Sequence, residues 1–269
     1  MNINNFVINR IRRASMFSTT NGVALWNITQ VENPSLSVTT DKNEAVDALG
    51  VRIMEFERAK NAEFTAENSL FDFGLAAAQS GTEKREAAVG ATITMPKWEE
   101  IKLTQDQIGE TKITLAEVPV GTSGSEIPFI YKLNGDGTLA EKYSSGLEAA
   151  AGTFTLNAAT KELTLPTALK AGDRLWIPYE FACQNGVEVY NTAIDFPKAG
   201  KFVMEVLGVD VCDTSKEYYA YVVFPNAKLN GDFDLSFTTD GKHPFTIQAM
   251  QQYCDAEKRL FSILIPDAV

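Results

Sequence analysis

The sequence predicts a mainly β protein, built from antiparallel sheets of the sandwich or barrel-forming kind with one short α-helix packed on the flank, plus a long loop and an N-terminal arm. Apolar and polar residues alternate through most of residues 201–266, and most clearly in 232–238. A period of two with one apolar face is typical of half-buried antiparallel strands. Asn230-Gly231 and Asp240-Gly241 tolerate the positive φ of tight hairpin turns. The expected apolar face of 232–238 consists of Phe233, Leu235 and Phe237.

Composition limits the classes of function. The 269 residues carry a formal net charge of −11 and are expected to form a single domain over 1–269. An acidic chain argues against phosphate-held nucleic-acid binding, although DNA can slide past such a surface. Cys183, Cys212 and Cys254 are too few and too widely spaced for a disulfide framework or a zinc site. No run of about 18 apolar residues exists, so we expect no transmembrane helix and no membrane partner.

The N-terminal region contains two segments without a clear core-forming pattern. Residues 1–16 are expected to be an arm, because the cluster Arg10, Arg12 and Arg13 follows the apolar residues instead of preceding them as in a signal peptide. These three arginines are candidate assembly contacts. Residues 23–28 predict a strand, and the polar residues 32–50 predict a long loop with an assembly role.

One helix is expected, over residues 70–80, after two strands at 51–58 and 62–67. Ser69 followed by Asp72 resembles a capping box, and Gly81 is placed as the left-handed residue after the helix. The helix is expected to cover one side of a sheet.

The middle of the chain predicts hairpins. Residues 127–181 are a possible inserted β lobe, with turns at 134–137 and 157–160. Pro178 lies inside the alternating run 174–181 and therefore predicts an edge strand or a bulge. The final meander is expected to have strands at 202–207, 218–224, 232–238, 245–250 and 260–265.

Candidate chemistry is sparse. His243, the only histidine, lies in a predicted surface turn, which we favour over a catalytic role. Residues 134–138 have a calcium-like Asp/Gly spacing without the closing Glu of an EF-hand, so a hairpin turn is favoured. Asp232 and Asp234 suit a solvated face better than a glycosidase pair. A sugar platform is conceivable but packing is favoured for Trp176, Tyr179, Tyr218, Tyr219 and Tyr221. We therefore expect no enzyme, no cofactor and no metal.

Three stretches resemble the major tail (tail tube) proteins of long-tailed bacteriophages. They are the helix region 67–79 (ENSLFDFGLAAAQ), residues 224–245 with PNAK and DFDLSFTTDGKHPF, and the end 260–267 (LFSILIPD). The resemblance implies a virion tail protein assembled in the host cytoplasm. It would form rings, typically of six subunits, whose sheets join into an inner barrel. Rings would stack through loops and arms, contact other tail proteins, and let double-stranded DNA pass an acidic lumen faced by Asp232 and Asp234.

Two alternatives stay open. One is a capsid decoration or other virion structural protein, and the other is a carbohydrate-binding β-sandwich module. The unpaired cysteines and the lack of a classical secretion signal disfavour the second. Tubes or rings in negative-stain micrographs would separate the tube protein from the first alternative.

Overall fold

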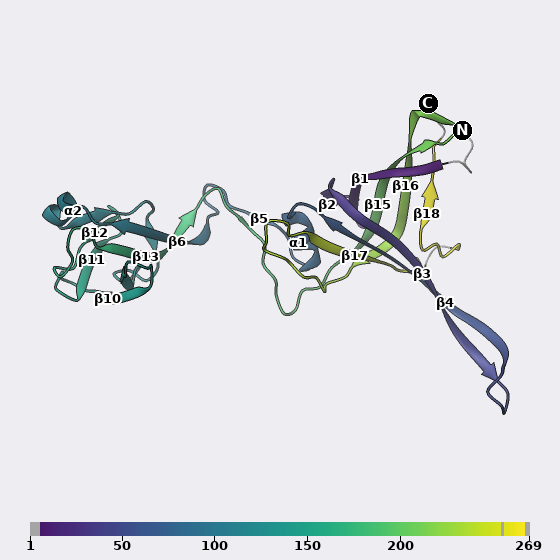
Figure 1. Cartoon of the computed structure of the whole chain (residues 1–269), viewed down its shortest axis with the longest axis horizontal. Helices are drawn as coiled ribbons and strands as arrows, with labels where there is room; N and C mark the ends of the chain where they lie inside the picture. Colours follow the sequence, from purple (N-terminus) through teal and green to yellow (C-terminus); the bar gives the residue numbers. More distant parts are fainter. Residues whose placement is uncertain (1–5, 254–255, 267–269) are drawn as a thin grey trace. The chain divides into compact units, whose positions relative to one another are not determined.

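The computed structural model describes residues 6–253 and 256–266 and divides the chain into two compact units. Unit 1 comprises residues 1–84 and 189–269, and unit 2 comprises residues 85–188. The predicted mainly β, antiparallel class is confirmed, because each unit is built on a sheet that is antiparallel except for one short parallel pair in unit 2, and the described residues of each unit include one short helix (Figure 1). The expected lobe over 127–181 falls within unit 2, which begins earlier at Arg85.

Unit 1 is an eight-stranded sheet in the order β2-β1-β15-β16-β17-β4-β3, with β18 paired to β16. Its pairings are antiparallel, and the meander strands expected near 202–207, 218–224, 245–250 and 260–265 are all present. The strands are β1 (Phe6–Ser18), β2 (Ala24–Ile28), β3 (Val31–Val46), β4 (Arg52–Asn68), β15 (Ala199–Asp210), β16 (Asp213–Leu229), β17 (His243–Ala249) and β18 (Ser262–Leu264).

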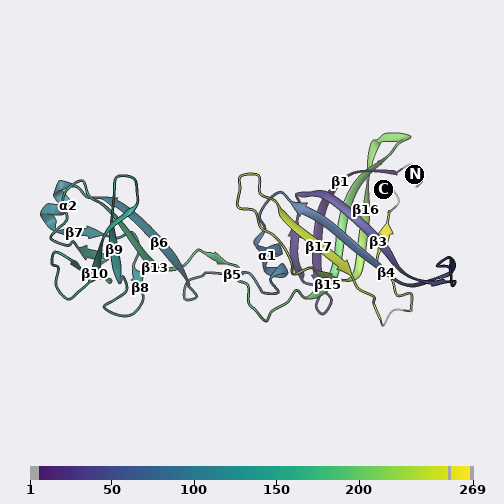
Figure 2. The same cartoon turned by 60° about the horizontal axis from the view of Figure 1, so that its bottom comes forward.

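The sheet of unit 1 curls around its core like half of a barrel (Figure 2). Aromatic rings fill the concave side. Phe202 lies 5.7 Å from each of Trp26, Phe64 and Phe224, measured between ring centroids, and Phe245 contacts two members of the same group. Such tilted and edge-on pairs are the favoured geometries for buried rings. The core therefore draws on β2, β4, β15, β16 and β17 together.

The expectation of a long loop over 32–50 is wrong. Most of this segment is β3, which pairs with β4 from Val31↔Asn68 to Val46↔Arg52. The segment lacks an apolar alternation because most of its side chains are exposed, so burial imposes no pattern on the sequence. Residues 51–58 and 62–67, expected as two strands, are one continuous strand β4.

The N-terminal arm is also different from the expectation. Residues 6–16 belong to β1, which lies between β2 and β15 in the sheet and not on its own. Ala14 and Met16 are fully buried in the core of unit 1. Removing this strand would remove core residues, so residues 6–16 are structural as well as a candidate for assembly.

The helix α1 (Phe73–Gln79) has seven residues and starts later than expected. Asp72 is its N-cap and accepts a hydrogen bond from the Leu75 backbone N–H at 2.7 Å, so Ser69 does not cap it. Leu75 is fully buried against the sheet, as predicted for a helix on the flank. Gly81 has φ +74°, which confirms its left-handed position, and a Cβ there would lie 2.4 Å from the Phe196 backbone.

No strand forms over 232–238, which corrects the clearest expectation from the alternating pattern. The segment runs irregularly between β16 and β17. Phe233 and Leu235 are half-buried, whereas Phe237 is 92% exposed. Alternation is not sufficient here, because the segment forms no ladder with β17, which pairs with β4 along 243–248 and with β16 only at 247–249.

Unit 2 has its own core, formed by apolar residues of a second eight-stranded sheet in the order β6-β13-β9-β10-β11-β12-β7, with β8 paired to β13. The expected hairpins at 134–137 and 157–160 are present. Residues 105–110, a polar stretch, form α2 (Gln105–Glu110) behind a Thr104/Gln107 capping box. The strands of this sheet are β6 (Ile93–Lys102), β7 (Lys112–Thr114), β8 (Pro119–Val120), β9 (Phe129–Leu133), β10 (Leu139–Ser145), β11 (Thr153–Asn157), β12 (Glu162–Thr164) and β13 (Arg174–Cys183). β5 (Arg85–Glu86) and β14 (Val187–Glu188) pair with each other in a separate two-stranded sheet.

Pro178 lies in β13, which is an interior strand, so the edge expectation is wrong. On one side Pro178 pairs with Trp98 of β6. On the other side β9 pairs only with residues 174–176 and β8 only with 180–181. Pro178 falls in the gap between β9 and β8, where the missing N–H interrupts no ladder.

Candidate functional site

The most exposed structure in unit 1 is the outer part of the β3–β4 hairpin, residues 38–61, called the ribbon below. It extends as a two-stranded ribbon away from the curled sheet of unit 1 (Figure 1). Almost all of its side chains are exposed on both faces. An isolated two-stranded hairpin is marginally stable in water, so a ribbon of this length is expected to gain stability from a partner.

One face of the ribbon is held by ion pairs. The cross-strand register places Lys42, Glu44, Arg52 and Glu55 on this face. Glu55 pairs with Lys42 and, at 2.7 Å, with Arg52, while Arg52 also pairs with Glu44. The hydrogen bond from Lys42 lowers the pKa of the Glu55 carboxyl, and the same bond raises the pKa of Lys42. Exposed ion pairs contribute little to the free energy of unfolding, so the main effect of these contacts is to hold the exposed strands in one conformation.

The opposite face of the ribbon is apolar near its tip. Met54 and Phe56 share this face with Ala45, and each of the two larger side chains is 53% exposed. At the tip, Leu49 is exposed in a turn that the Asp47 carboxylate closes by accepting hydrogen bonds from the Leu49 and Val51 N–H groups. Apolar side chains clustered on one exposed face are typical of a protein–protein contact. Sequence analysis missed this face, because the run 51–58 was expected to be an ordinary strand of the sheet.

The predicted assembly residues Arg10, Arg12 and Arg13 are exposed on β1. Arg12 lies 3.5 Å from the Glu205 carboxylate and 5.5 Å from the centroid of the Tyr219 ring. This side chain is already engaged within the chain. Arg10 and Arg13 are the two arginines for which contact with another copy stays a prediction.

The predicted lumen residues Asp232 and Asp234 are both exposed. They lie beside Phe233 and the start of β17 in the irregular segment after β16. The strand on which the lumen placement depended is absent, so the alternation argument for that placement no longer holds. Whether either carboxylate faces a lumen stays a prediction.

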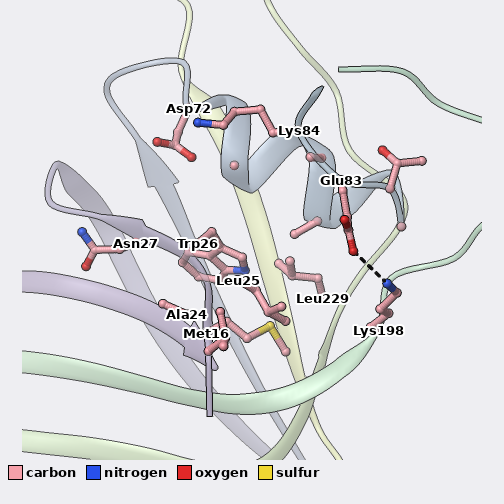
Figure 3. A pocket seen from close by; sticks show the side chains of 16 residues that line it. Met16, Ala24, Leu25, Trp26, Asn27, Asp72, Glu83, Lys84, Lys198 and Leu229 are labelled. Carbon is pink, nitrogen blue, oxygen red and sulfur yellow. Dashed lines mark ion pairs between the residues drawn. The ribbon is translucent and has the colours of Figure 1, made fainter. Parts of the chain in front are cut away.

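A pocket of about 480 Å³ lies beside α1 in unit 1 (Figure 3). Its floor is apolar, with Met16, Trp26 and Leu229, and Glu83 and Lys198 form a 3.7 Å ion pair at one side. Among the described residues no acceptor reaches the buried indole N–H of Trp26. The lining contains no histidine, cysteine or serine.

His243 is buried, which corrects the expected surface turn. Its Nε2 lies 2.6 Å from Gln79 Oε1, while the Gln79 amide donates to the Pro244 carbonyl at 2.9 Å. The Gln79 oxygen therefore accepts, and Nε2 carries the proton. In the described part of the chain Nδ1 has no hydrogen-bond partner, and Phe71 stacks on the ring at 5.2 Å. Burial lowers the pKa of His243, with a smaller opposite effect from the Asp72 carboxylate.

This environment predicts a loss of stability in mild acid. Below the ordinary pKa of 6.5 the unfolded chain binds a proton that the folded chain excludes, so the free energy of unfolding falls as pH decreases. Thermal unfolding at pH 7.5, 6.5 and 5.5 should show a falling melting temperature. A His243→Gln variant, which can still donate to Gln79, should show a flatter profile. An equal pH slope in both proteins would contradict the assignment.

The remaining chemical candidates do not come together. Asp136 accepts from the Thr138 N–H and hydroxyl within the 134–137 turn, as the hairpin interpretation predicts. Within 6–253 and 256–266 there is no group of three or more His, Cys, Asp or Glu side chains that could hold a metal ion. No helix in the described ranges is long and apolar enough to span a membrane. The aromatic candidates are divided, with Trp176 and Tyr179 in unit 2 and Tyr218, Tyr219 and Tyr221 in unit 1.

The sequence model described as the YomU/Tube protein family matches residues 6–259, nearly the whole chain. No curated protein matches. The match includes both units and the ribbon.

Proposed function

The chain belongs to the YomU/Tube protein family, a family of phage tail tube proteins, and on that premise we propose that it polymerises into the tube through which phage DNA is ejected. As a tail tube protein it is a structural component of the virion. The proposal adds that six subunits form each ring, the number that the family resemblance implies, and that the rings stack, with other tail proteins at the ends of the stack. Its role is mechanical, without catalysis, and assembly takes place in the host cytoplasm.

The observation that carries the proposal is the ribbon. Its apolar face and its tip are exposed in the single chain, while the opposite face is fixed by ion pairs. A projecting element that contacts a different surface of the next copy makes a heterologous interface. Repeated heterologous contacts produce closed rings or open-ended stacks, which are the two arrangements that a tube requires.

Sheet edges supply the second type of contact. Strands β2 and β3 are the two ends of the main strand order in unit 1. Edge strands present unpaired backbone N–H and C=O groups that recruit other strands. We propose that edge pairing between neighbouring copies joins the curled sheets into a continuous barrel around the lumen.

The proposal is tested by negative-stain microscopy of purified protein over a series of concentrations. Tubes or stacked rings are the expected result, and symmetry averaging of top views gives the number of subunits. Particles that stay monomeric at every concentration, with and without added phage tail components, would refute self-assembly by this chain.

The exposed arginines are predicted to guide assembly. Because the chain has a net charge of −11, a neighbouring copy presents mostly acidic surface, which attracts Arg10 and Arg13. Reversing both charges (Arg10→Glu, Arg13→Glu) should slow tube formation about tenfold at low salt, with a smaller effect at high salt. Light scattering measures the rate. Lys102→Glu with Lys170→Glu, which changes the net charge equally within unit 2, is the control, and equal slowing in both variants would contradict the prediction.

A further inference from the structure

Three aromatic rings lie next to one another on the outer face of the unit 2 sheet. They belong to β6, β13 and β9, which are neighbours in the strand order. Trp176 is central, with its ring centroid 6.3 Å from that of Trp98 and 5.4 Å from that of Tyr131. Trp98, Trp176 and Tyr131 are called the aromatic row below.

The aromatic row is on the opposite side of the sheet from the core. Along β13, Leu175 and Ile177 alternate with Trp176 and are fully buried in the core of unit 2. Trp98 is 71% exposed, so its indole gains little from packing. A large exposed ring that contributes little to the stability of its own fold can contact a ligand instead.

A charged pair borders the aromatic row on the same face. Glu100 lies directly opposite Trp176 in the β6–β13 register, and Arg174 precedes Trp176 by two residues. Arg174 Nε donates to Glu100 Oε1 at 2.7 Å, and both side chains keep part of their surface in solvent. The pair therefore presents a carboxylate acceptor and guanidinium donors next to the rings.

Charge excludes one class of ligand. Unit 2 contains nine Lys and Arg residues against fourteen Asp and Glu residues, a net charge of −5. Nucleic acids and other polyanions stack on aromatic platforms only where a positive groove attracts their phosphates. The ligand of the aromatic row is therefore not expected to be a polyanion.

We propose that the aromatic row of unit 2 is a binding site for a neutral oligosaccharide chain. The C–H faces of sugar rings pack on the electron-rich faces of aromatic rings, while their hydroxyls bond to charged side chains at the edge. Rings spread over three strands provide room for more than one sugar unit. A protein partner that excludes water from the interface would have to desolvate Glu100 and Arg174. Sugar hydroxyls can instead replace the water molecules around these two side chains.

The site does not depend on the proposed tube. Its residues all belong to unit 2, and none belongs to the ribbon or to β1. Sugar binding is measured on soluble protein, and tube formation is measured separately by microscopy. Failure of one measurement therefore leaves the other interpretable.

The test uses the full-length chain and tryptophan fluorescence. Two of the three tryptophans, Trp98 and Trp176, lie in the aromatic row, and the third, Trp26, is buried in unit 1. Titration with neutral hexasaccharides (cellohexaose, chitohexaose, laminarihexaose and maltohexaose) should give a saturable change with at least one of them. Trp98→Ala should weaken that binding about tenfold, Trp98→Phe should restore most of it, and Glu100→Gln should weaken it.

Leu147→Ala, which changes a fully exposed side chain of unit 2 outside the aromatic row, serves as the matched control. Circular dichroism confirms that each variant is folded. The proposal is overturned if none of the four sugars binds at millimolar concentration, or if Trp98→Ala and Leu147→Ala bind equally well. Binding of a purified tail protein at the aromatic row, without sugar binding, would assign this face to a protein partner and would also overturn it.

Discussion

A variant with serine at both Met54 and Phe56 is expected to remain a folded monomer and to form no tubes. The two side chains lie on the apolar face of the ribbon and are half exposed, so the single chain loses little when they become polar. In the assembled tube they would be buried. Interface residues of this kind contribute about 2 kcal/mol each, so the concentration needed for assembly should rise by about a hundredfold or more.

The matched control changes the other face of the same ribbon. Glu57→Gln with Lys60→Gln alters two exposed residues whose cross-strand partners lie on the charged face. This control should assemble at nearly the wild-type concentration. Melting temperatures of all three proteins verify folding, and sedimentation together with microscopy measures assembly. Normal tubes from the Met54/Phe56 double variant would show that the apolar face is not an interface.

The largest loss of stability is expected from Leu75→Ala. Leu75 is completely buried where α1 meets the sheet, and the same core contains Trp26 and Phe202. Truncating a leucine at such a site removes its apolar contacts and leaves a cavity, at a cost of about 2–5 kcal/mol. Urea unfolding measures the loss.

Phe71→Ala gives the informative contrast. Phe71 is 47% exposed and precedes the first turn of α1, but its ring stacks on His243. Its truncation should cost clearly less than that of Leu75, because less apolar surface is buried. If the two variants are equally unstable, the Phe71–His243 stack is as important for stability as the docking of α1.

Local patterns predicted the strands that are buried on one face. In β15 and β13, apolar side chains alternate because every second residue enters a core. The alternation in the sequence therefore predicts these strands. The hairpins at 134–137 and 157–160 were predictable for a related reason, since the first turn is Asn-Gly-Asp-Gly and the second begins with Asn157, which are residues that favour turns. The family resemblance, which rested on the helix region and the C-terminal stretches, is confirmed by the family match.

The candidate site was less predictable. The ribbon carries no burial pattern because it has no partner within the chain, and β3 was therefore mistaken for a loop. The aromatic row joins residues 98, 131 and 176, which become neighbours only through the β6-β13-β9 strand order. Cross-strand proximity of this kind cannot be obtained from spacing along the sequence.

The sequence by itself determined the β class, most strands of the last third and the left-handed turn at Gly81. These features depend on interactions between near neighbours or on a single buried face. Only the tertiary structure decided that 232–238 is not a strand, that His243 is buried against Gln79, and that β1 lies inside the sheet. Each of these outcomes depends on contacts between residues far apart in the chain, which local patterns do not record.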